Sequence, residues 1–247
     1  MIMLLVTGIT GHSGRWFLKR LKSENYPGKI RCIIRSSRET ALEQYSIFEN
    51  CNLDLEFVVG DLKDEVFLLE ALKDVDTIVH IAGISLSSKL FFAAIENGVD
   101  WAILVHTTGR YSKYKNASDG YIQIEDEILN RTIYAKSGER CMNCTILRPT
   151  MIYGSSQDRN MYRLVEYLNT HRFFPLFGDG KNLMQPVHAR DLGNAYYDVL
   201  HSPDITMNRE YNLSGRDPLT YLKIIETIKK NLNSKVKIIK LPITLSI

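Results

Sequence analysis

Thr7-Gly-Ile-Thr-Gly-His-Ser-Gly14 lies between a short apolar run at residues 2–7 and a helix-like segment that starts at Gly14. The order of strand, glycine-rich loop and helix is the context in which a glycine pattern becomes informative. Gly8 permits a tight turn, Gly11 lets the backbone approach a ligand, and Gly14 lets the helix pack closely against the strand. The helix start offers N–H groups and a positive dipole end, so we expect a phosphate-bearing ligand there.

The remaining chain continues the alternation of strands and helices. Apolar runs at residues 30–34, 55–59, 77–81, 102–107 and 144–147 are separated by helix-like segments, and they are apolar almost throughout. Such strands are typical of a parallel sheet with helices on both faces. We therefore predict an α/β fold: a doubly wound parallel sheet (Rossmann) with a small C-terminal lobe.

The strand–helix rhythm loosens after Pro149, which sets the expected domain boundary. We expect the sheet domain to span residues 1–152 and the small lobe residues 153–247. Residues 185–202, approximately, are expected to return to the sheet domain.

Composition narrows the classes of partner. The chain has 247 residues, 45% of them hydrophobic and 24% charged, which is ordinary for a globular protein. A net charge of +3 without a basic block argues against a nucleic-acid partner. No apolar run approaches the roughly 18 residues that a membrane span needs, so a membrane partner is not expected either.

The N-terminal apolar run lacks the basic region of a signal peptide, and we expect a cytoplasmic protein. Cys141-Met-Asn-Cys144 is a CxxC pair without the second pair that a zinc site needs, so we interpret both residues as ordinary thiols. No metal site is predicted.

Arg35-Ser-Ser-Arg38 ends the second strand, 21 residues beyond Gly14. An acidic residue at this point would hold the ribose 2′-hydroxyl of NAD. A guanidinium suits a 2′-phosphate through charge-assisted hydrogen bonds, so we predict NADP(H), with NAD(H) as the alternative. Solvated surface arginines are the simpler interpretation of the same residues.

Further motifs follow later strands: Gly60-Asp61-Leu62, His80-Ile-Ala-Gly83, Leu147-Arg-Pro-Thr-Met-Ile-Tyr-Gly154, Phe177-Gly-Asp-Gly180 and Gln185-Pro-Val-His-Ala-Arg-Asp-Leu192. With the glycine loop they resemble the short-chain dehydrogenase/reductase superfamily, in its extended and atypical branches (the NAD-dependent epimerase/dehydratase type). The resemblance runs from residue 1 to about residue 215.

The resemblance and the 2′-phosphate argument together define the expected cofactor site. Its residues are Gly8, Thr10, Gly11, His12, Ser13, Gly14, Arg35, Ser36, Arg38, Asp61, Leu62, Ile81, Ala82, Gly83, Pro149 and Ile152. Two aspartates have simpler interpretations. Asp61 would be a turn residue, and Asp191 a helix N-cap.

In this superfamily a Ser or Thr after strand five, a Tyr, and a Lys four residues later do the chemistry. The lysine favours the phenolate, which exchanges a proton with a substrate hydroxyl while hydride moves to or from nicotinamide. Thr107 or Thr108 could fill the first role and Tyr121, expected to open the next helix, the second. Glu125 stands where the lysine is expected, and a carboxylate there would favour the protonated phenol. A first-turn acidic cluster is the simplest interpretation of Glu125.

A literal YxxxK pattern also occurs earlier, at Tyr111–Lys115. We expect residues 116–120 to form a loop, so the lysine would not be held beneath the tyrosine. Tyr111 itself stays a catalytic candidate that could face the nicotinamide pocket.

Three functions stay open. The first is an NADP(H)-dependent reductase or isomerase acting on a small carbonyl or hydroxyl compound. The second, favoured by the missing lysine, is a non-catalytic NADP(H)-binding sensor or scaffold module. The third is a nucleotide-sugar epimerase or dehydratase. Members that handle such substrates often carry an arginine four residues after the GDG motif, where Met184 stands here and Lys181 is the nearby cation.

We expect a small-molecule substrate as partner, with a homodimer left open. Extended members usually run longer than this chain, so the lobe is expected to be minimal or incomplete.

Overall fold

A computed structural model describes residues 3–35, 48, 52–113, 115–132, 141–156, 158 and 160–242. The chain divides into two compact units, each formed by two stretches. The first unit comprises Met1–Pro149 and Arg190–Leu213, and the second comprises Thr150–Ala189 and Ser214–Ile247. The returning stretch therefore runs from residue 190 to residue 213, later than the 185–202 expected from the sequence.

The first unit is built on a seven-stranded sheet in which every pair of neighbours is parallel, in the order β11-β6-β5-β4-β1-β2-β3. This arrangement confirms the predicted doubly wound sheet. Its elements are β1 (Met3–Thr7), α1 (Gly14–Ser23), β2 (Lys29–Ile34), β3 (Leu55–Val59), α3 (Glu65–Ala71), β4 (Thr77–His80), α4 (Ser87–Glu96), β5 (Trp101–Val105), α5 (Lys115–Leu129), β6 (Asn143–Pro149), α7 (Ala189–Leu200), α8 (Pro203–Thr206) and β11 (Glu210–Leu213).

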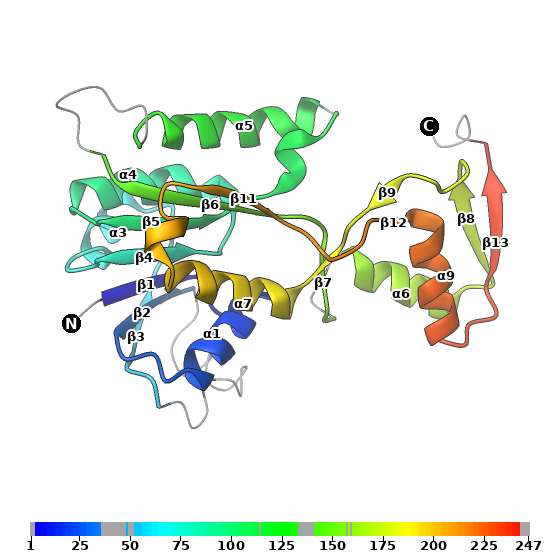
Figure 1. The fold of residues 1–247 in the computed structure, drawn as a ribbon, viewed down its shortest axis with the longest axis horizontal. Helices are drawn as coiled ribbons and strands as arrows, with labels where there is room; N and C mark the ends of the chain where they lie inside the picture. Colours follow the sequence, from blue (N-terminus) through cyan, green and yellow to red (C-terminus); the bar gives the residue numbers. More distant parts are fainter. Residues whose placement is uncertain are drawn as a thin grey trace. The chain divides into compact units, whose positions relative to one another are not determined.

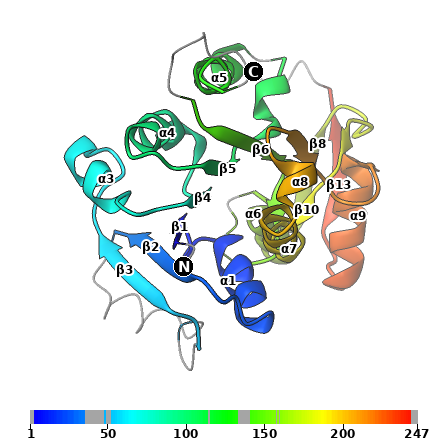
Figure 2. The same ribbon diagram turned by 60° about the vertical axis from the view of Figure 1, so that its left-hand side comes forward.

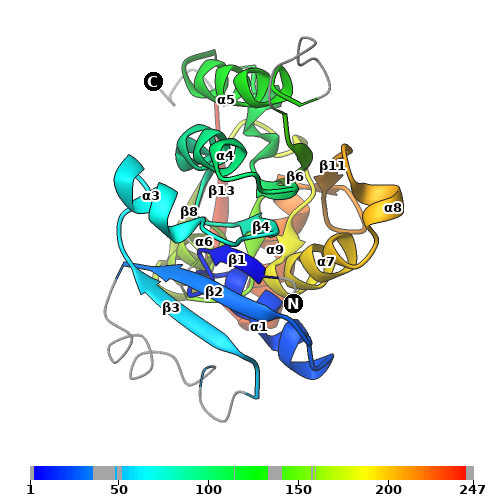
Figure 3. The ribbon, with the colours of Figure 1, turned by 90° about the vertical axis from the view of Figure 1, so that its left-hand side faces the viewer.

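Helices cover both faces of this sheet. Figures 2 and 3 show α3, α4 and α5 on one face and α1 and α7 on the other. Side chains alternate along each strand, so one set packs beneath α3, α4 and α5. That set includes Leu5, Ile78, Ala102, Leu104 and Ile146, all fully buried. The two-sided burial explains why the strands are apolar almost throughout.

The register of β5 and β6 sets the position of the side chains beyond their ends. Val105 lies opposite Leu147, and the His106 N–H donates to the Leu147 carbonyl at 2.8 Å. His106 and Arg148 therefore lie side by side. Both follow the alternation of Ala102, Leu104 and Ile146, so their side chains face α5.

In its described residues, the second unit contains three short two-stranded pairings and two helices. Its elements are β7 (Ile152–Tyr153), α6 (Met161–Thr170), β8 (Phe173–Phe177), β9 (Leu183–Met184), β10 (Val187–His188), β12 (Leu219–Thr220), α9 (Tyr221–Asn231) and β13 (Lys237–Leu241). A small core of Leu168, Phe174, Leu176, Ile225 and Val236 joins α6 and α9 to the β8–β13 pair.

The region around α5 differs from the sequence-based prediction. Residues 116–120, expected as a loop, are helical, because α5 already begins at Lys115. Tyr121 therefore lies inside the helix instead of opening it, and Glu125 lies beyond the first turn. Asp191 lies in the first turn of α7, which begins at Ala189, so it is not the N-cap.

Within the described ranges no helix is both long enough and apolar enough to cross a membrane.

Candidate functional site

The predicted site residues of the first unit gather at one edge of the sheet. Parallel strands end at a common edge, and β1, β2, β3, β4, β5 and β6 are all parallel. The glycine loop follows β1, residues 81–83 follow β4, Thr107 follows β5 and Pro149 ends β6. Ile152, predicted for the same site, lies in the second unit, where β7 pairs with β10.

The glycine loop is packed too closely for side chains at two positions. Gly8 has φ +72°, and a Cβ there would lie 2.7 Å from the Ala82 backbone nitrogen. A Cβ at Gly14 would lie 2.2 Å from the Gly8 carbonyl oxygen. The loop is closed by a hydrogen bond of 2.9 Å from the Gly11 N–H to the Gly8 carbonyl. The first turn of α1 is thus pressed against the end of β1, as the glycine spacing predicts.

A buried hydrogen-bond chain joins the ends of β1 and β4. His80 Nε2 lies 3.0 Å from the Gly83 carbonyl, so it donates, and Nδ1 accepts from the Thr7 hydroxyl at 2.7 Å. The Ala82 N–H donates to the same Thr7 oxygen at 3.4 Å. Burial lowers the pKa of His80 to about 4, against the opposing effect of the Gly83 hydrogen bond. His80 is therefore neutral at physiological pH and fixes the loop at residues 81–83.

The residues predicted to bind the cofactor's 2′-phosphate lie after β2, and those predicted to lie against its adenine follow β3. Arg35 follows β2 and is exposed, whereas Ser36 and Arg38 lie outside the described residues. Asp61 is exposed and accepts the Lys63 N–H at 3.0 Å, which is the geometry of a turn residue. Leu62 lies in the apolar core, so only its backbone is available to a ligand.

Three of the four predicted catalytic hydroxyls lie around one glycine. Thr107 Oγ1 accepts the Gly109 N–H at 3.0 Å, and Thr108 Oγ1 donates to the Pro149 carbonyl at 3.2 Å. A Cβ on Gly109 would lie 3.1 Å from the Tyr121 ring and 3.3 Å from Thr107 Oγ1. Tyr121 and Thr107 are thus neighbours, although Tyr121 does not start its helix.

Glu125 is fully buried at the centre of a cluster of charged side chains. Its carboxylate accepts hydrogen bonds from Arg148 Nη2 at 2.6 Å and from Arg148 Nε at 2.9 Å. Arg110 also pairs with Glu125, and Arg148 pairs with Glu210. The interpretation of Glu125 as part of a first-turn acidic cluster is therefore wrong, because α5 begins ten residues earlier and strands β5 and β6 place His106 and Arg148 directly beneath Glu125.

His106 completes the cluster from the other side. Its Nδ1 lies 3.0 Å from Glu125 Oε1, and its Nε2 lies 3.0 Å from the Ser87 hydroxyl. Burial lowers the pKa of His106, against the opposing effect of Glu125, so the ring is neutral with its proton on Nδ1. Burial would raise the pKa of Glu125, but the hydrogen bonds from His106 and Arg148 outweigh it and lower that pKa to about 2.

This geometry joins a serine, a histidine and a glutamate as in a nucleophilic triad, but Ser87 is fully buried and no substrate can reach it. Because His106 is neutral, the two positive charges of Arg110 and Arg148 balance the two negative charges of Glu125 and Glu210. The cluster is therefore a compensated structural network at the place where the superfamily's lysine is expected.

Tyr111 lies at the rim of the cluster. Its hydroxyl accepts a hydrogen bond from Arg148 Nη1 at 3.2 Å, and 56% of the residue is exposed. Among the described tyrosines, Tyr111 is the one whose hydroxyl is bonded to a guanidinium. The side chain of Lys115, its partner in the literal YxxxK pattern, is not among the described ones.

The spacing of residues in the sequence indicates this cluster, although the comparison of motifs did not use it. Glu125 falls at helical spacing from Ser118 and Ile128, which are both buried. His106 and Arg148 are polar residues at the ends of apolar strands. A polar or charged residue at each of these buried positions indicates a buried network of hydrogen bonds and ion pairs.

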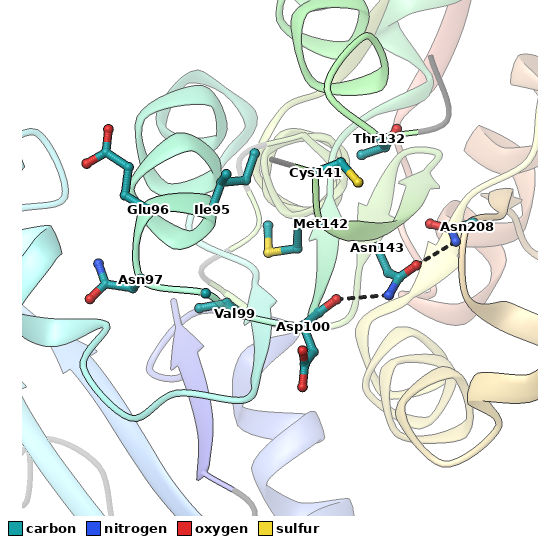
Figure 4. A pocket seen from close by; sticks show the side chains of 11 residues that line it. Ile95, Glu96, Asn97, Val99, Asp100, Thr132, Cys141, Met142, Asn143 and Asn208 are labelled. Atoms are coloured by element: carbon teal, nitrogen blue, oxygen red, sulfur yellow. Dashed lines mark hydrogen bonds between the residues drawn. The ribbon is translucent and has the colours of Figure 1, made fainter. Parts of the chain in front are cut away.

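A cavity of about 490 Å³ opens at the opposite edge of the sheet, where β5 and β6 begin (Figure 4). Asn143 on its wall donates to the Asp100 carbonyl at 3.1 Å and accepts from Asn208 at 2.8 Å. Thr132 and Cys141 border the cavity, and the stretch between them, 133–140, lies outside the residues that the structure describes. Its position separates it from the glycine loop.

Across the described part of the chain, no three His, Cys, Asp or Glu side chains are grouped so that they could hold a metal ion. Cys141 is exposed, Cys144 is buried, and neither is in a disulfide. Burial raises the pKa of Cys144, so its thiol is inert.

Comparison of the sequence with known proteins gives partial matches. The sequence model of the GDP-mannose 4,6 dehydratase family matches residues 5–95. "Short-chain dehydrogenase/reductase family 42E member 1" of Bos taurus is 28% identical over 123 residues, which are 47% of this chain and 30% of that protein. An Escherichia coli O157:H7 protein, "N-acetyl-alpha-D-glucosaminyl-diphospho-ditrans,octacis-undecaprenol 4-epimerase", is 24% identical over 74% of this chain and 63% of its own length. The chain thus spans less than two thirds of the length of either relative.

Comparison of the fold gives a match over almost the whole chain. The UDP-glucuronic acid 4-epimerase from Bacillus cereus, solved in complex with UDP-glucuronic acid and NAD, superposes with a TM-score of 0.78 at 18% identity. The match covers 98% of this chain and 86% of that one. At this identity the likeness establishes the fold.

Proposed function

We propose that this chain, a member of the extended, epimerase/dehydratase type of the short-chain dehydrogenase/reductase superfamily, binds a nicotinamide dinucleotide and oxidises or reduces a small hydroxyl or carbonyl compound. The observation that carries the proposal is the glycine loop. A loop without space for side chains at Gly8 and Gly14, at the start of a helix, fits a pyrophosphate held by backbone N–H groups. Residues 81–83, fixed by His80, would border the adenosine ribose.

When bound, the nicotinamide would supply a hydride donor or acceptor. The chain's own part is to orient the substrate and to move one proton at its oxygen atom. The Thr107 hydroxyl would orient that oxygen, and the hydroxyl of Tyr121 or Tyr111 would exchange the proton with it. Glu125 takes no part in this transfer, because Arg148, Arg110 and His106 already hold its carboxylate.

Arg35 supports NADP(H) as the preferred cofactor. The Arg35 side chain is exposed after β2, and its guanidinium would bind a 2′-phosphate. In a fluorescence titration we expect NADPH to bind more tightly than NADH. Arg35→Ala should weaken NADPH binding about tenfold and leave NADH unchanged. Arg172→Ala, at an exposed arginine of the second unit, is the control. Equal affinity for NADPH and NADH in the unmodified protein would refute the preference.

Turnover is tested by following cofactor oxidation with simple carbonyl compounds, quinones and nucleotide sugars. Thr107→Val, Tyr121→Phe and Tyr111→Phe should each retain cofactor binding, and the variants that lose turnover identify the acting hydroxyls. Reaction with nucleotide sugars alone would favour the epimerase or dehydratase alternative, which the family matches support.

A binding module without turnover is the second candidate, and the buried cluster at Glu125 favours it. The position expected to carry a lysine is occupied by a carboxylate that cannot leave its partners. This candidate predicts cofactor binding without turnover on any class of substrate. Different affinities for NADP⁺ and NADPH would then support a redox-sensing role.

A further inference from the structure

Helix α7 lies directly on the first turn of α1, although the two are far apart in sequence. A Cβ on Gly193 would lie 2.6 Å from the Phe17 backbone nitrogen. The Tyr196 and Phe17 rings meet edge to face, with centroids 6.1 Å apart. The returning stretch of chain therefore supports the helix that begins at the glycine loop.

One hydrogen bond reaches the loop itself. The Tyr196 hydroxyl donates to Ser13 Oγ at 3.2 Å, and both side chains are buried. Burial raises the pKa of Tyr196, so the hydroxyl stays protonated and remains a donor.

Ser13 is the residue before α1, where serine is a favoured capping residue. It does not cap: its side chain makes no bond to the helix, and its backbone is helical, with φ −84° and ψ −27°. A capping serine takes an extended conformation and places its oxygen on the N–H groups of the first turn. The hydrogen bond from the Tyr196 hydroxyl instead holds the Ser13 side chain away from these N–H groups.

We propose that Tyr196 is a positioning residue for the dinucleotide: by holding Ser13 Oγ, it prevents Ser13 from capping α1 and keeps the Ser13–Gly14 backbone in the helical conformation that the phosphates would meet. This role rests on the proposed function, because the ligand is the proposed nicotinamide dinucleotide. Its mechanism depends on the Tyr196–Ser13 hydrogen bond. Releasing the side chain lets Ser13 turn to the capping conformation, which rotates the Ser13–Gly14 backbone away from its binding geometry.

Two substitutions separate this role from simple packing. Tyr196→Phe keeps the buried ring and removes the hydroxyl, and NADPH binding should weaken about three- to tenfold. Adding Ser13→Ala removes the side chain that would cap, so the double variant should bind nearly as tightly as the unmodified protein. Tyr197→Phe, the same change one position along α7, is the control and should have no effect.

Nicotinamide fluorescence titration gives the affinities, and hydrogen exchange of the cofactor-free protein gives a second measurement. Exchange of the amides at residues 13–16 should change in Tyr196→Phe and return in the double variant. If the double variant binds as weakly as Tyr196→Phe, the hydroxyl acts on rigidity alone and the inference is wrong. Unchanged affinity and exchange in Tyr196→Phe would also overturn it.

If the unmodified protein binds neither NADPH nor NADH, the proposed cofactor fails. The exchange measurement then still decides whether Tyr196 controls the conformation of Ser13.

Discussion

The carboxylate of Glu125, one helical turn after Tyr121, is paired with the guanidinium of Arg148 from the neighbouring strand β6. Both side chains are almost inaccessible to solvent, at 0% and 4% exposed. Glu125, at the position where the superfamily's lysine is expected, is therefore one member of a buried ion pair.

Placing a lysine at position 125 should destabilise the protein. Glu125→Lys would place an ammonium beside Arg148 and Arg110 with no space for water, and we expect a loss of about 3–5 kcal/mol in the free energy of unfolding. Urea unfolding followed by circular dichroism measures the loss. Glu127→Lys, at an exposed position on the same helix, should change stability by less than about 0.5 kcal/mol. A Glu125→Lys variant as stable as the unmodified protein would contradict the cluster.

Removing both charges should cost less than removing one. Arg148→Met alone leaves the Glu125 carboxylate with less positive charge beside it. Glu125→Leu alone leaves Arg148 with the half-exposed Glu210 and the Tyr111 hydroxyl as its described partners. Combining Glu125→Leu with Arg148→Met removes both buried charges, so the double variant should recover about 2 kcal/mol relative to the sum of the single variants. Additive losses in the same unfolding assay would show that the two residues are not coupled.

His80 should make stability depend on pH. Its folded pKa of about 4 lies below the 6.5 of an exposed imidazole. Between these values the unfolded chain binds a proton that the folded chain does not, so stability is full above pH 6.5 and falls as pH approaches 4, by about 3 kcal/mol. Urea unfolding across this range should show a smaller slope in His80→Gln. Equal slopes would mean that His80 is not held neutral.

Two glycine substitutions should act in opposite directions. Gly14→Ala forces a Cβ to within 2.2 Å of the Gly8 carbonyl, so the loop must move. We expect cofactor binding to weaken at least about tenfold, with a loss of stability of about 1–3 kcal/mol. Gly120→Ala has open space around it within α5 and should stabilise by about 0.5–1 kcal/mol without affecting binding. Unaltered affinity in Gly14→Ala would refute the proposed phosphate site.

Six of the seven strands of the sheet were predictable because each carried its own signal, whereas β11, partly polar and half-exposed, was not among the predicted apolar runs. Continuous apolar runs and the glycines at 8, 11 and 14 act over a few residues, and the structure confirms the resulting doubly wound order. The start of α5 was not predictable in this way. Asn116, Asp119 and Gly120 are typical of loops, but helix α5 continues through them, with Ser118, Glu125 and Ile128 buried on its inner side.

The charged cluster was missed for a different reason. It depends on the register of β5 and β6, which brings His106 beside Arg148, and on a helix from another part of the chain that supplies Glu125. Patterns within one segment of sequence do not show which residues of two neighbouring strands lie opposite each other. The Tyr196–Ser13 contact is similar, since it joins residues 183 positions apart.

The division of the first unit into two stretches has a consequence for its synthesis. A ribosome that has reached Pro149 has made six of the seven strands, but α7 and β11 are still to come, after the whole of residues 150–189. Until then the nascent sheet has an open edge at β6 and one incompletely covered face. Contacts of such long sequence separation fold slowly and expose apolar surface meanwhile. Chaperone demand during translation should therefore be highest while residues 150–213 emerge, and should fall once α7 docks.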